Sequence, residues 1–336
     1  MIVYEHQCSG HINSAEFLNG CIGYDKTIIP PSCKLWSFSS ALNQTQRYSA
    51  VRSHLFELIN YITYLNWRER ERDESCVLCF CCNATNLLYL TKKNTAVNQS
   101  ITYETSNRVY KVGAALHKML PEDFPWSSRG HLVRCAVVGN GGILKNSSCG
   151  REIDSADFVI RLNLAPVNGS DVGVKTDLVT INPSQNMAVN PGPLVRHVSV
   201  YGNVSLMIPA FAYTVCTAVS IKTLQVFQPI RPQQPVVFFS PYYLKTLDRF
   251  WKGLGLKEKR FSTGFMLVNM ALELCDDVHL YGFWPFDINL KQQTLQHHYY
   301  DNKPPKPFVH AMPEEFIHLL QLHSQGALTL HLQPCL

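Results

Sequence analysis

The sequence predicts an α/β protein built on a mostly parallel sheet flanked by helices. Three observations support this class. From Cys135 onward, short apolar runs typical of buried strands alternate with segments of helical spacing, as in a sheet covered on both faces. The first run leads into the glycine-rich turn GNGG at 139–142, as strands before phosphate-binding loops do. A composition of 46% hydrophobic and 16% charged residues is that of a chain with a packed core.

The amino-terminal part differs from the rest in its pattern. Residues 1–75 are irregular and contain the charge run WRERERDE at 67–74, which is typical of a solvated helix face. A chain of 336 residues is long enough for one large domain and an appendage. We therefore divide it into a variable region, residues 1–75, and a folded domain, residues 76–336.

The elements of the folded domain can be justified in order. Apolar runs predict strands at 134–138, 157–163, 177–183, 206–211, 236–239 and 278–283. Helical spacing predicts helices at 240–255, 265–275 and 313–326. The second helix is apolar nearly all round and follows Ser262-Thr263-Gly264, so we expect it to be deeply buried behind a hydroxyl N-cap.

Charge, cysteines and sequons narrow the function. The net charge of +5 suits an anionic ligand and is too small and dispersed to indicate nucleic-acid binding. Among the twelve cysteines, Cys76 and Cys79 form one CxxC pair, and no second pair completes a zinc site. Six N-x-S/T sequons occur where chance would give roughly three. With the scattered cysteines they favour a secretory-pathway protein with disulfides. The sequons begin at Asn43, Asn83, Asn98, Asn146, Asn168 and Asn203.

No stretch of this sequence is a candidate for spanning a bilayer. The longest apolar segment, LFELINYITYL from Leu55, is about half the required length and contains Glu57. The first residues also lack the basic region and apolar core of a leader. For a secretory protein, we therefore expect the targeting segment to lie outside this sequence.

The turn GNGG admits two interpretations. A dinucleotide fingerprint requires GxGxxG, but Leu144 stands where the third glycine belongs, and the Gly-Lys-Ser/Thr ending of a Walker A loop is absent. The turn is thus either a tight strand-to-helix connection or a place where backbone amides approach a phosphate. Asn140 favours the second reading, since a carboxamide after a strand can hydrogen-bond a ribose or a phosphate.

The cap Ser262-Thr263-Gly264 is the second candidate. A helix N-terminus with hydroxyls and a glycine offers amide donors and the positive end of the helix dipole to an anion. The alternative is an ordinary N-cap, which is the commoner case for such a motif taken alone.

Histidines near the carboxyl end form the third candidate, in HHYYDN (297–302) and HAMPEE (310–315). A metal site is not indicated, because His297 and His298 are adjacent, His310 lies in a separate loop, and no HxxxH, HExxH or Asp-x-Asp pair occurs. A metal-free reaction needs a base, and His310 can serve as one if Glu315 orients its imidazole. The alternative is that His310 caps the helix that opens at Pro313.

Four segments resemble the motifs of the animal sialyltransferases, and they occur in the same order. Residues 135–184 resemble the long motif, 260–286 the short motif, 298–301 motif III and 310–315 the very short motif, His-x-x-x-x-Glu. GNGGILKNSSCGREID, YGFWPF, HHYYDN and HAMPEE are similar to the α2,8-sialyltransferase branch. CCNATNLLYLTKKNT (81–95) resembles the members that add one or a few sialic acids, and 103–134 lacks the strongly basic segment of the polymer-making members.

The resemblance implies a GT-A-like sialyltransferase fold, CMP-sialic acid as donor, an inverting reaction, and no cofactor or metal. The phosphate at the glycine turn would be that of CMP. His310 would be the general base, and His298 would donate to the departing phosphate; Glu315 is the expected orienting partner of the base. The residues implied to bind CMP-sialic acid are Asn140, Asn163, Ser262, Thr263, Gly264 and Trp284.

The resemblance also implies two disulfides, Cys135 with Cys275 and Cys149 with Cys335, and leaves the other eight cysteines without partners. Residues 1–75 would be a stem-like region and 76–336 the sialyltransferase catalytic domain. The expected location is the lumenal side of the Golgi membrane, with an anchor that this sequence does not contain. The expected partners are a sialylated glycoprotein or glycolipid acceptor and a second copy in a homodimer.

Two departures from the branch keep other functions open. Arg161-Leu162-Asn163-Leu164-Ala165-Pro166 stands where the branch has R-C-N-L-P-P, which preserves the asparagine. Residues 182–203, which help to shape the acceptor side, are several residues shorter and less helical in pattern than in relatives. The alternatives are a catalytically impaired, sialyltransferase-like glycan-binding protein, a sialyltransferase of another linkage, and a nucleotide-sugar enzyme that uses a dinucleotide.

Overall fold

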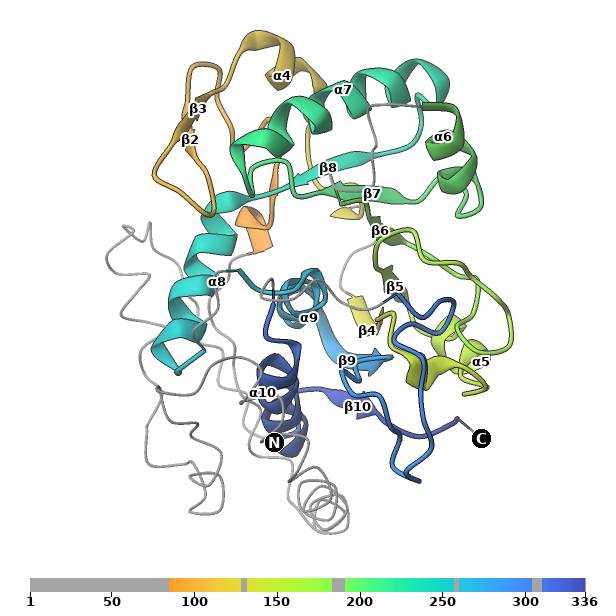
Figure 1. The fold of residues 1–336 in the computed structure, drawn as a ribbon. Helices are drawn as coiled ribbons and strands as arrows, with labels where there is room; N and C mark the ends of the chain where they lie inside the picture. Colours follow the sequence, from red (N-terminus) through yellow and green to blue (C-terminus); the bar gives the residue numbers. More distant parts are fainter. Residues whose placement is uncertain (1–84, 128–131, 183–190, 257–259, 304–309, 336) are drawn as a thin grey trace, which may run out of the picture.

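The computed structural model describes residues 85–127, 132–182, 191–256, 260–303 and 310–335. These residues form an eight-stranded sheet of order β1-β8-β7-β6-β5-β4-β9-β10 (Figure 1). All neighbours are parallel except β1, which pairs antiparallel with β8 at the edge. The strands are β1 (Tyr89–Leu90), β4 (Leu132–Val138), β5 (Phe158–Arg161), β6 (Leu178–Thr180), β7 (Ser205–Ile208), β8 (Val236–Phe239), β9 (Cys275–Tyr281) and β10 (Thr329–His331).

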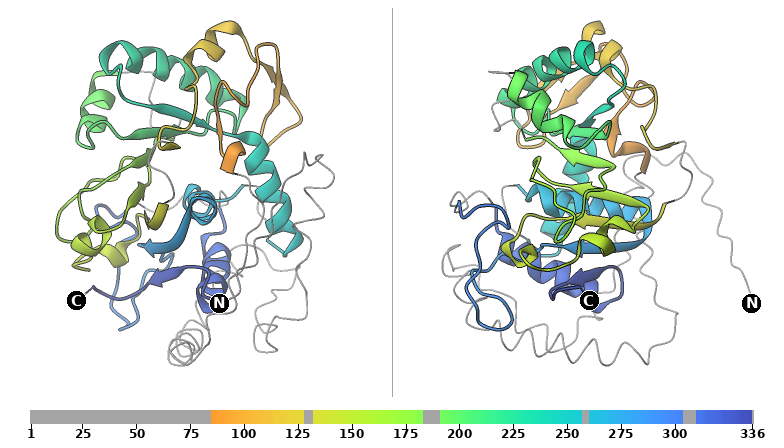
Figure 2. Two further views of the ribbon diagram at one scale, coloured as in Figure 1. Left: turned by 180° about the vertical axis from the view of Figure 1, so that it is seen from behind. Right: turned by 90° about the vertical axis from the view of Figure 1, so that its right-hand side faces the viewer.

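Helices cover both faces of the sheet. Apolar side chains on one face pack with α8 (Pro241–Gly253), α9 (Thr263–Leu274) and α10 (Met312–Ser324). The opposite face packs with α4 (Ala114–Met119), α6 (Pro191–Ser199) and α7 (Thr214–Ile230) over β6 to β8, and with α5 (Gly150–Asp154) over β4, β5 and β9. Figures 1 and 2 show α7 along β7 and β8, at the end of the molecule away from α10.

Strand β4 shows why the sequence forms this arrangement. Cys135 and Val137 point to the face of α9, whereas Ala136 and Val138 point to the face of α5. Both sets are buried, so the strand reads as a continuous apolar run rather than as an alternation, as expected for a central parallel strand. The predicted fold class, a mostly parallel sheet flanked by helices, is confirmed.

The predicted elements are present, with shifts at their ends. The strand expected at 206–211 ends at Ile208, because Pro209 follows and the chain turns toward α7. The strand expected from residue 278 begins earlier, at Cys275, directly after α9. Helix α6, not predicted, occupies nine residues of the 182–203 segment and begins at Pro191, where a missing N–H costs nothing. A small antiparallel pair, β2 (Ser100–Thr102) and β3 (Val109–Lys111), lies outside the main sheet.

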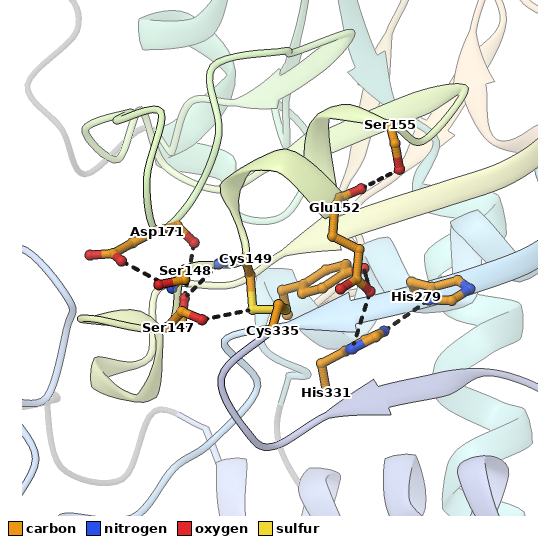
Figure 3. Close-up of a disulfide and its surroundings, with 10 residues drawn as sticks. Ser147, Ser148, Cys149, Glu152, Ser155, Asp171, His279, His331 and Cys335 are labelled. Atoms are coloured by element: carbon orange, nitrogen blue, oxygen red, sulfur yellow. Dashed lines mark hydrogen bonds and ion pairs between the residues drawn. A yellow bond between two sulfur atoms is a disulfide. The ribbon is translucent and has the colours of Figure 1, made fainter.

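Two disulfides fix this fold, and both are the pairs that the resemblance implied. Cys135 of β4 is joined to Cys275 at the start of β9, with 6.0 Å between Cα atoms. Cys149, before α5, is joined to Cys335 near the carboxyl end, with 4.8 Å between Cα atoms (Figure 3). Cys216 is the free cysteine among the described residues; the remaining seven lie outside them.

Several predictions concern surfaces and segments rather than the sheet. Four of the sequon asparagines are described, and all four are exposed: Asn98, Asn146, Asn168 and Asn203. Asn43, Asn83 and the boundary at 75/76 lie outside the described residues. Where the chain is described, its helices are too short or too polar to cross a membrane.

Candidate active site

The sequence-predicted residues gather at one edge of the sheet, where the parallel strands end. From β4 the chain moves outward through β5, β6 and β7 to β8, while β9 and β10 lie on the other side of β4. The order therefore reverses between β4 and β9. In open α/β sheets, a crevice forms outside the carboxyl ends of the strands at such a switch point, and ligands bind there.

The GNGG turn lies at this switch point and requires its glycines. The amide of Gly141 donates to the carbonyl of Gly282, after β9, at 3.0 Å. A Cβ on Gly141 would stand 2.5 Å from that same oxygen, and one on Gly142 would stand 1.9 Å from the carbonyl oxygen of Gln296. The turn is thus packed between two other segments by close backbone approach, which only glycine allows.

Asn140 and Asn163 are brought to the same level of the edge by strand register. Val138 pairs with Arg161, and each asparagine follows two residues later. The side-chain oxygen of Asn140 is buried without a hydrogen-bond partner among the described residues. Asn163 adopts a left-handed conformation with φ of 58°, and its amide donates to Oγ1 of Thr180 at 2.9 Å. Both carboxamides therefore start from adjacent strand ends.

The amino terminus of α9 meets these strand ends. Ser262 is the N-cap, with its Oγ accepting from the amide of Phe265 at 3.1 Å. A Cβ on Gly264 would stand 3.0 Å from Phe283 and 3.5 Å from Leu162, so the first turn packs directly on the loops after β9 and β5. The positive end of a buried twelve-residue helix is thereby held at the switch point.

His310 is fixed just before α10 and beside the start of α9. Its Nδ1 lies 3.0 Å from the carbonyl oxygen of Arg260. A carbonyl only accepts, so Nδ1 carries the proton in the neutral ring and the lone pair is on Nε2. Burial lowers the pKa of His310; the hydrogen bond to the Arg260 carbonyl opposes that shift, and the Arg260 charge adds to it. The imidazole is therefore neutral near pH 7, as a general base requires.

Glu315 contacts the cap of α9, and its predicted role in orienting His310 stays a prediction. Its Oε1 accepts from the backbone amide of Ser262 at 2.6 Å, and its side chain is buried. It therefore ties the first turn of α10 to the cap of α9. The hydrogen bond at Nδ1 of His310, where an orienting carboxylate was expected, is made by the Arg260 carbonyl.

His298 reaches the edge from the 297–302 loop, which docks on the glycine turn. Gly141 and His298 form an isolated antiparallel bridge, and the amide of Tyr299 donates to the carbonyl of Asn140 at 3.1 Å. Nδ1 of His298 lies 2.7 Å from Oδ1 of Asp301, and its ring stacks on Tyr300 with centroids 5.1 Å apart. The hydrogen bond from His298 lowers the pKa of Asp301, so the partner is a carboxylate.

Trp284 follows β9 at the same edge, but its indole is turned into the core. It is 4% exposed, its Nε1 donates to the carbonyl of Ile288 at 2.7 Å, and its ring contacts Phe286 and Phe316. Its predicted place in the donor pocket stays a prediction.

The sequence analysis did not predict an ion pair beside the site, between Arg260 and Glu104. Nε of Arg260 lies 2.9 Å from Oε1 of Glu104, and both side chains are more than nine-tenths buried. The Nε–H direction misses the oxygen, so the contact is an ion pair rather than a well-formed hydrogen bond. No local signal could reveal a partner 156 positions away, although a basic residue two positions before a helix cap was a place to look.

The candidate metal group of the described residues lies at the end of β10, on the face of the sheet that α5 covers. It consists of Glu152, His331 and Cys335, and Cys335 is bonded to Cys149 (Figure 3). A sulfur in a disulfide is not the thiolate that metals bind. The arrangement of the site therefore rests on histidines, amides and a helix end.

Fold and site together define a class: a doubly wound α/β protein whose ligand site combines a glycine turn, a helix amino terminus and two oriented histidines. The model of glycosyltransferase family 29 (sialyltransferase) matches residues 85–327, and the chain belongs to this family. Its enzyme class, glycosyltransferase, is thereby confirmed.

Relatives place the chain within the family. It is 46% identical to alpha-2,8-sialyltransferase 8E of Homo sapiens over 265 residues, 76% of this chain and 70% of the relative. It is 39% identical to alpha-2,8-sialyltransferase 8F of Mus musculus over 329 residues, 92% of this chain and 81% of the relative. The expected resemblance to the α2,8 branch is confirmed. A solved mammalian sialyltransferase aligns with 74% of this chain and 90% of its own, at 25% identity and a TM-score of 0.48.

Proposed function

We propose that the protein is an α2,8-sialyltransferase. It transfers sialic acid from CMP-sialic acid to a sialylated glycan on a glycoprotein or glycolipid, with inversion at the anomeric carbon. The observation that carries the proposal is the convergence of His310, with its lone pair on Nε2, and the capped amino terminus of α9 at the switch point. The α2,8 linkage is taken from the relatives that bear this name, at identities of 39–46%.

The reaction needs one bond broken and one formed. The acceptor hydroxyl oxygen attacks the anomeric carbon of the donor sialic acid, and its proton passes to Nε2 of His310. The bond from the anomeric carbon to the phosphate oxygen breaks, and its electron pair leaves with CMP. One well-placed base accelerates such a step roughly 10²–10⁴-fold.

Charge on the departing phosphate is stabilised from several directions. His298 donates from Nε2, and positive charge on its ring is balanced by the Asp301 carboxylate at Nδ1. The amides of Thr263 and Gly264 and the hydroxyl of Ser262, at the positive end of α9, supply donors near the nucleotide, together with the carboxamides of Asn140 and Asn163. Fixed donors of this kind cost no reorganisation during the reaction.

This mechanism assigns the acid–base and electrostatic work to organic groups, so we propose that it needs no metal. We also propose the Golgi lumen as its location, on the basis of the family, the two disulfides and the exposed sequons. Residues 1–75 would then be the stem-like region and 76–336 the catalytic domain.

The test is CMP release and disialylated product formation from CMP-sialic acid and α2,3-sialyllactose. We expect transfer by the native protein and a loss of about 10²–10⁴ in kcat for His310→Ala, with CMP affinity, measured by calorimetry, changed less than threefold. His279→Ala, at a histidine outside the site, is the matched control and should keep native kcat. CMP binding without transfer to any sialylated acceptor on a glycan array would instead identify a glycan-binding protein.

A further inference from the structure

A cavity lies at this edge of the sheet, lined by residues that the proposed reaction does not use. It has a volume of about 640 Å³ and lies between the β2–β3 connection, the start of α7 and the end of α8. Its cations are Arg108 and Lys252, and its hydroxyl groups come from Thr105, Ser106 and Thr214. Both cations are exposed, so they can be desolvated and paired by a ligand.

The topology places this cavity beside the proposed reaction centre. Helix α7 follows the carboxyl end of β7, which is separated from β4 by β6 and β5. Three strand spacings amount to about 14 Å. The cavity and the switch point are therefore at the same edge, within the reach of one short oligosaccharide.

A buried link joins the cavity wall to the base. Glu104 precedes the lining residue Thr105, and its amide donates to the carbonyl of Phe211, just before α7, at 3.0 Å. The Glu104 carboxylate pairs with Arg260, and the carbonyl of Arg260 holds Nδ1 of His310. The cavity wall is thus connected to His310 through Glu104 and Arg260.

The chemistry of the lining suits an acidic sugar. Lys252 keeps one hydrogen bond to Asp248, at 2.8 Å, and its ammonium has further donors for a ligand. Tyr213 is the N-cap of the seventeen-residue helix α7, and no side chain caps that helix. Tyr213 and Val215, 43% and 77% exposed, add an apolar face for a sugar ring. Sialic acid has a carboxylate that these cations can pair with and a ring face that can pack on the apolar surface.

We propose that this cavity binds the terminal sialic acid of the acceptor and that Arg108 and Lys252 hold its carboxylate. The inference rests on the proposed function, and it adds the reason why an acceptor that already carries sialic acid is selected. Neither residue touches the reacting atoms. They determine specificity by fixing the sugar whose hydroxyl faces His310.

The experiment compares the double variant Arg108→Ala/Lys252→Ala with the native protein, using α2,3-sialyllactose and its carboxamide, in which the sialic acid carboxylate is uncharged. We expect the acceptor KM of the double variant to rise roughly ten- to hundredfold, the range for hydrogen bonds to charged groups. The donor KM and the slow hydrolysis of CMP-sialic acid should stay within twofold. With the carboxamide, the acceptor KM of the native protein should rise by a similar factor. The acceptor KM of the double variant should be nearly the same for both acceptors.

Two controls keep the outcome clear. Lys222→Ala removes an exposed cation from α7 outside the cavity lining and should leave the acceptor KM unchanged. Direct titration of α2,3-sialyllactose by NMR tests the cavity even if the native protein transfers nothing, which would overturn only the proposed function. An unchanged acceptor affinity in the double variant, or equal sensitivity of both proteins to the carboxamide, overturns the assignment of the cavity.

Discussion

Two pairs of histidines among the described residues differ in the groups that their ring nitrogens contact. His298 and His310 lie in loops at the carboxyl edge of the sheet, and each has Nδ1 held by one acceptor, Asp301 or the Arg260 carbonyl. His279 and His331 lie on the adjacent strands β9 and β10, in contact with each other at 2.8 Å from Nδ1 to Nε2.

The strand pair is closed at both ends by carboxylates. Nε2 of His279 lies 3.0 Å from Asp277, and Nδ1 of His331 lies 3.5 Å from Glu152 (Figure 3). Each ring nitrogen of this pair therefore faces a group of the protein. In the loop pair, each ring is held at Nδ1, by Asp301 in His298 and by the Arg260 carbonyl in His310. Under the proposed function, the strand pair holds structure and the loop pair exchanges protons with the substrate.

The largest effect expected from this comparison is on kcat. His298→Gln keeps a polar side chain but removes the proton that the departing phosphate receives, so we expect kcat to fall roughly 100-fold with a donor KM within a few-fold. His279→Gln, the same substitution in the strand pair, should leave kcat within twofold. Steady-state kinetics with CMP-sialic acid and α2,3-sialyllactose measure both. Equal losses in the two variants would remove the distinction between the pairs.

The next effect is on the acid side of the pH profile. Because burial and the Arg260 charge lower the pKa of His310, the base stays unprotonated below the ordinary histidine pKa of 6.5. We expect the acid limb of kcat/KM, where the protonated ring cannot accept the acceptor proton, to be centred below pH 6.5. Initial rates from pH 5 to 8 measure this. An acid limb centred above pH 6.5 would contradict the assignment of His310 as the base.

Short sequence motifs predicted much of the local structure at this edge of the sheet. They did not predict the contacts between segments that are far apart in the chain. The GNGG turn and the Ser262 cap are encoded in adjacent residues, and both have the expected local geometry. The partner of His310 could not be predicted, because the acceptor is a backbone carbonyl, a group that every residue carries. Glu315 has the right spacing from His310, yet its hydrogen bond to the Ser262 amide depends on the packing of α10 against α9.

The same limit explains the fold details. Side-chain type did not reveal that Trp284 faces the core, since an aromatic ring suits a pocket wall and a packed interior equally well. Helix α6 was missed because its opening PGP reads as a loop, although proline is favoured in a first helical turn. The ion pair of Glu104 with Arg260 joins segments far apart in the chain, and a single sequence carries no signal for it.

The smallest effect concerns the stability of the strand pair. Burial lowers the pKa of His331 to about 4, and the Glu152 carboxylate opposes that shift only in part. As the pH falls below 6.5, His331 is therefore protonated in the unfolded chain, where its pKa is the ordinary 6.5, but stays neutral in the folded chain. The native protein should lose about 1 kcal/mol of stability from this group by pH 5.5, or a few degrees in Tm.

His331→Gln should show a smaller decline in Tm between pH 7 and 5.5, and His197→Gln, at an exposed position on α6, should keep the native decline. Parallel declines in all three proteins would mean that folding does not lower the pKa of His331.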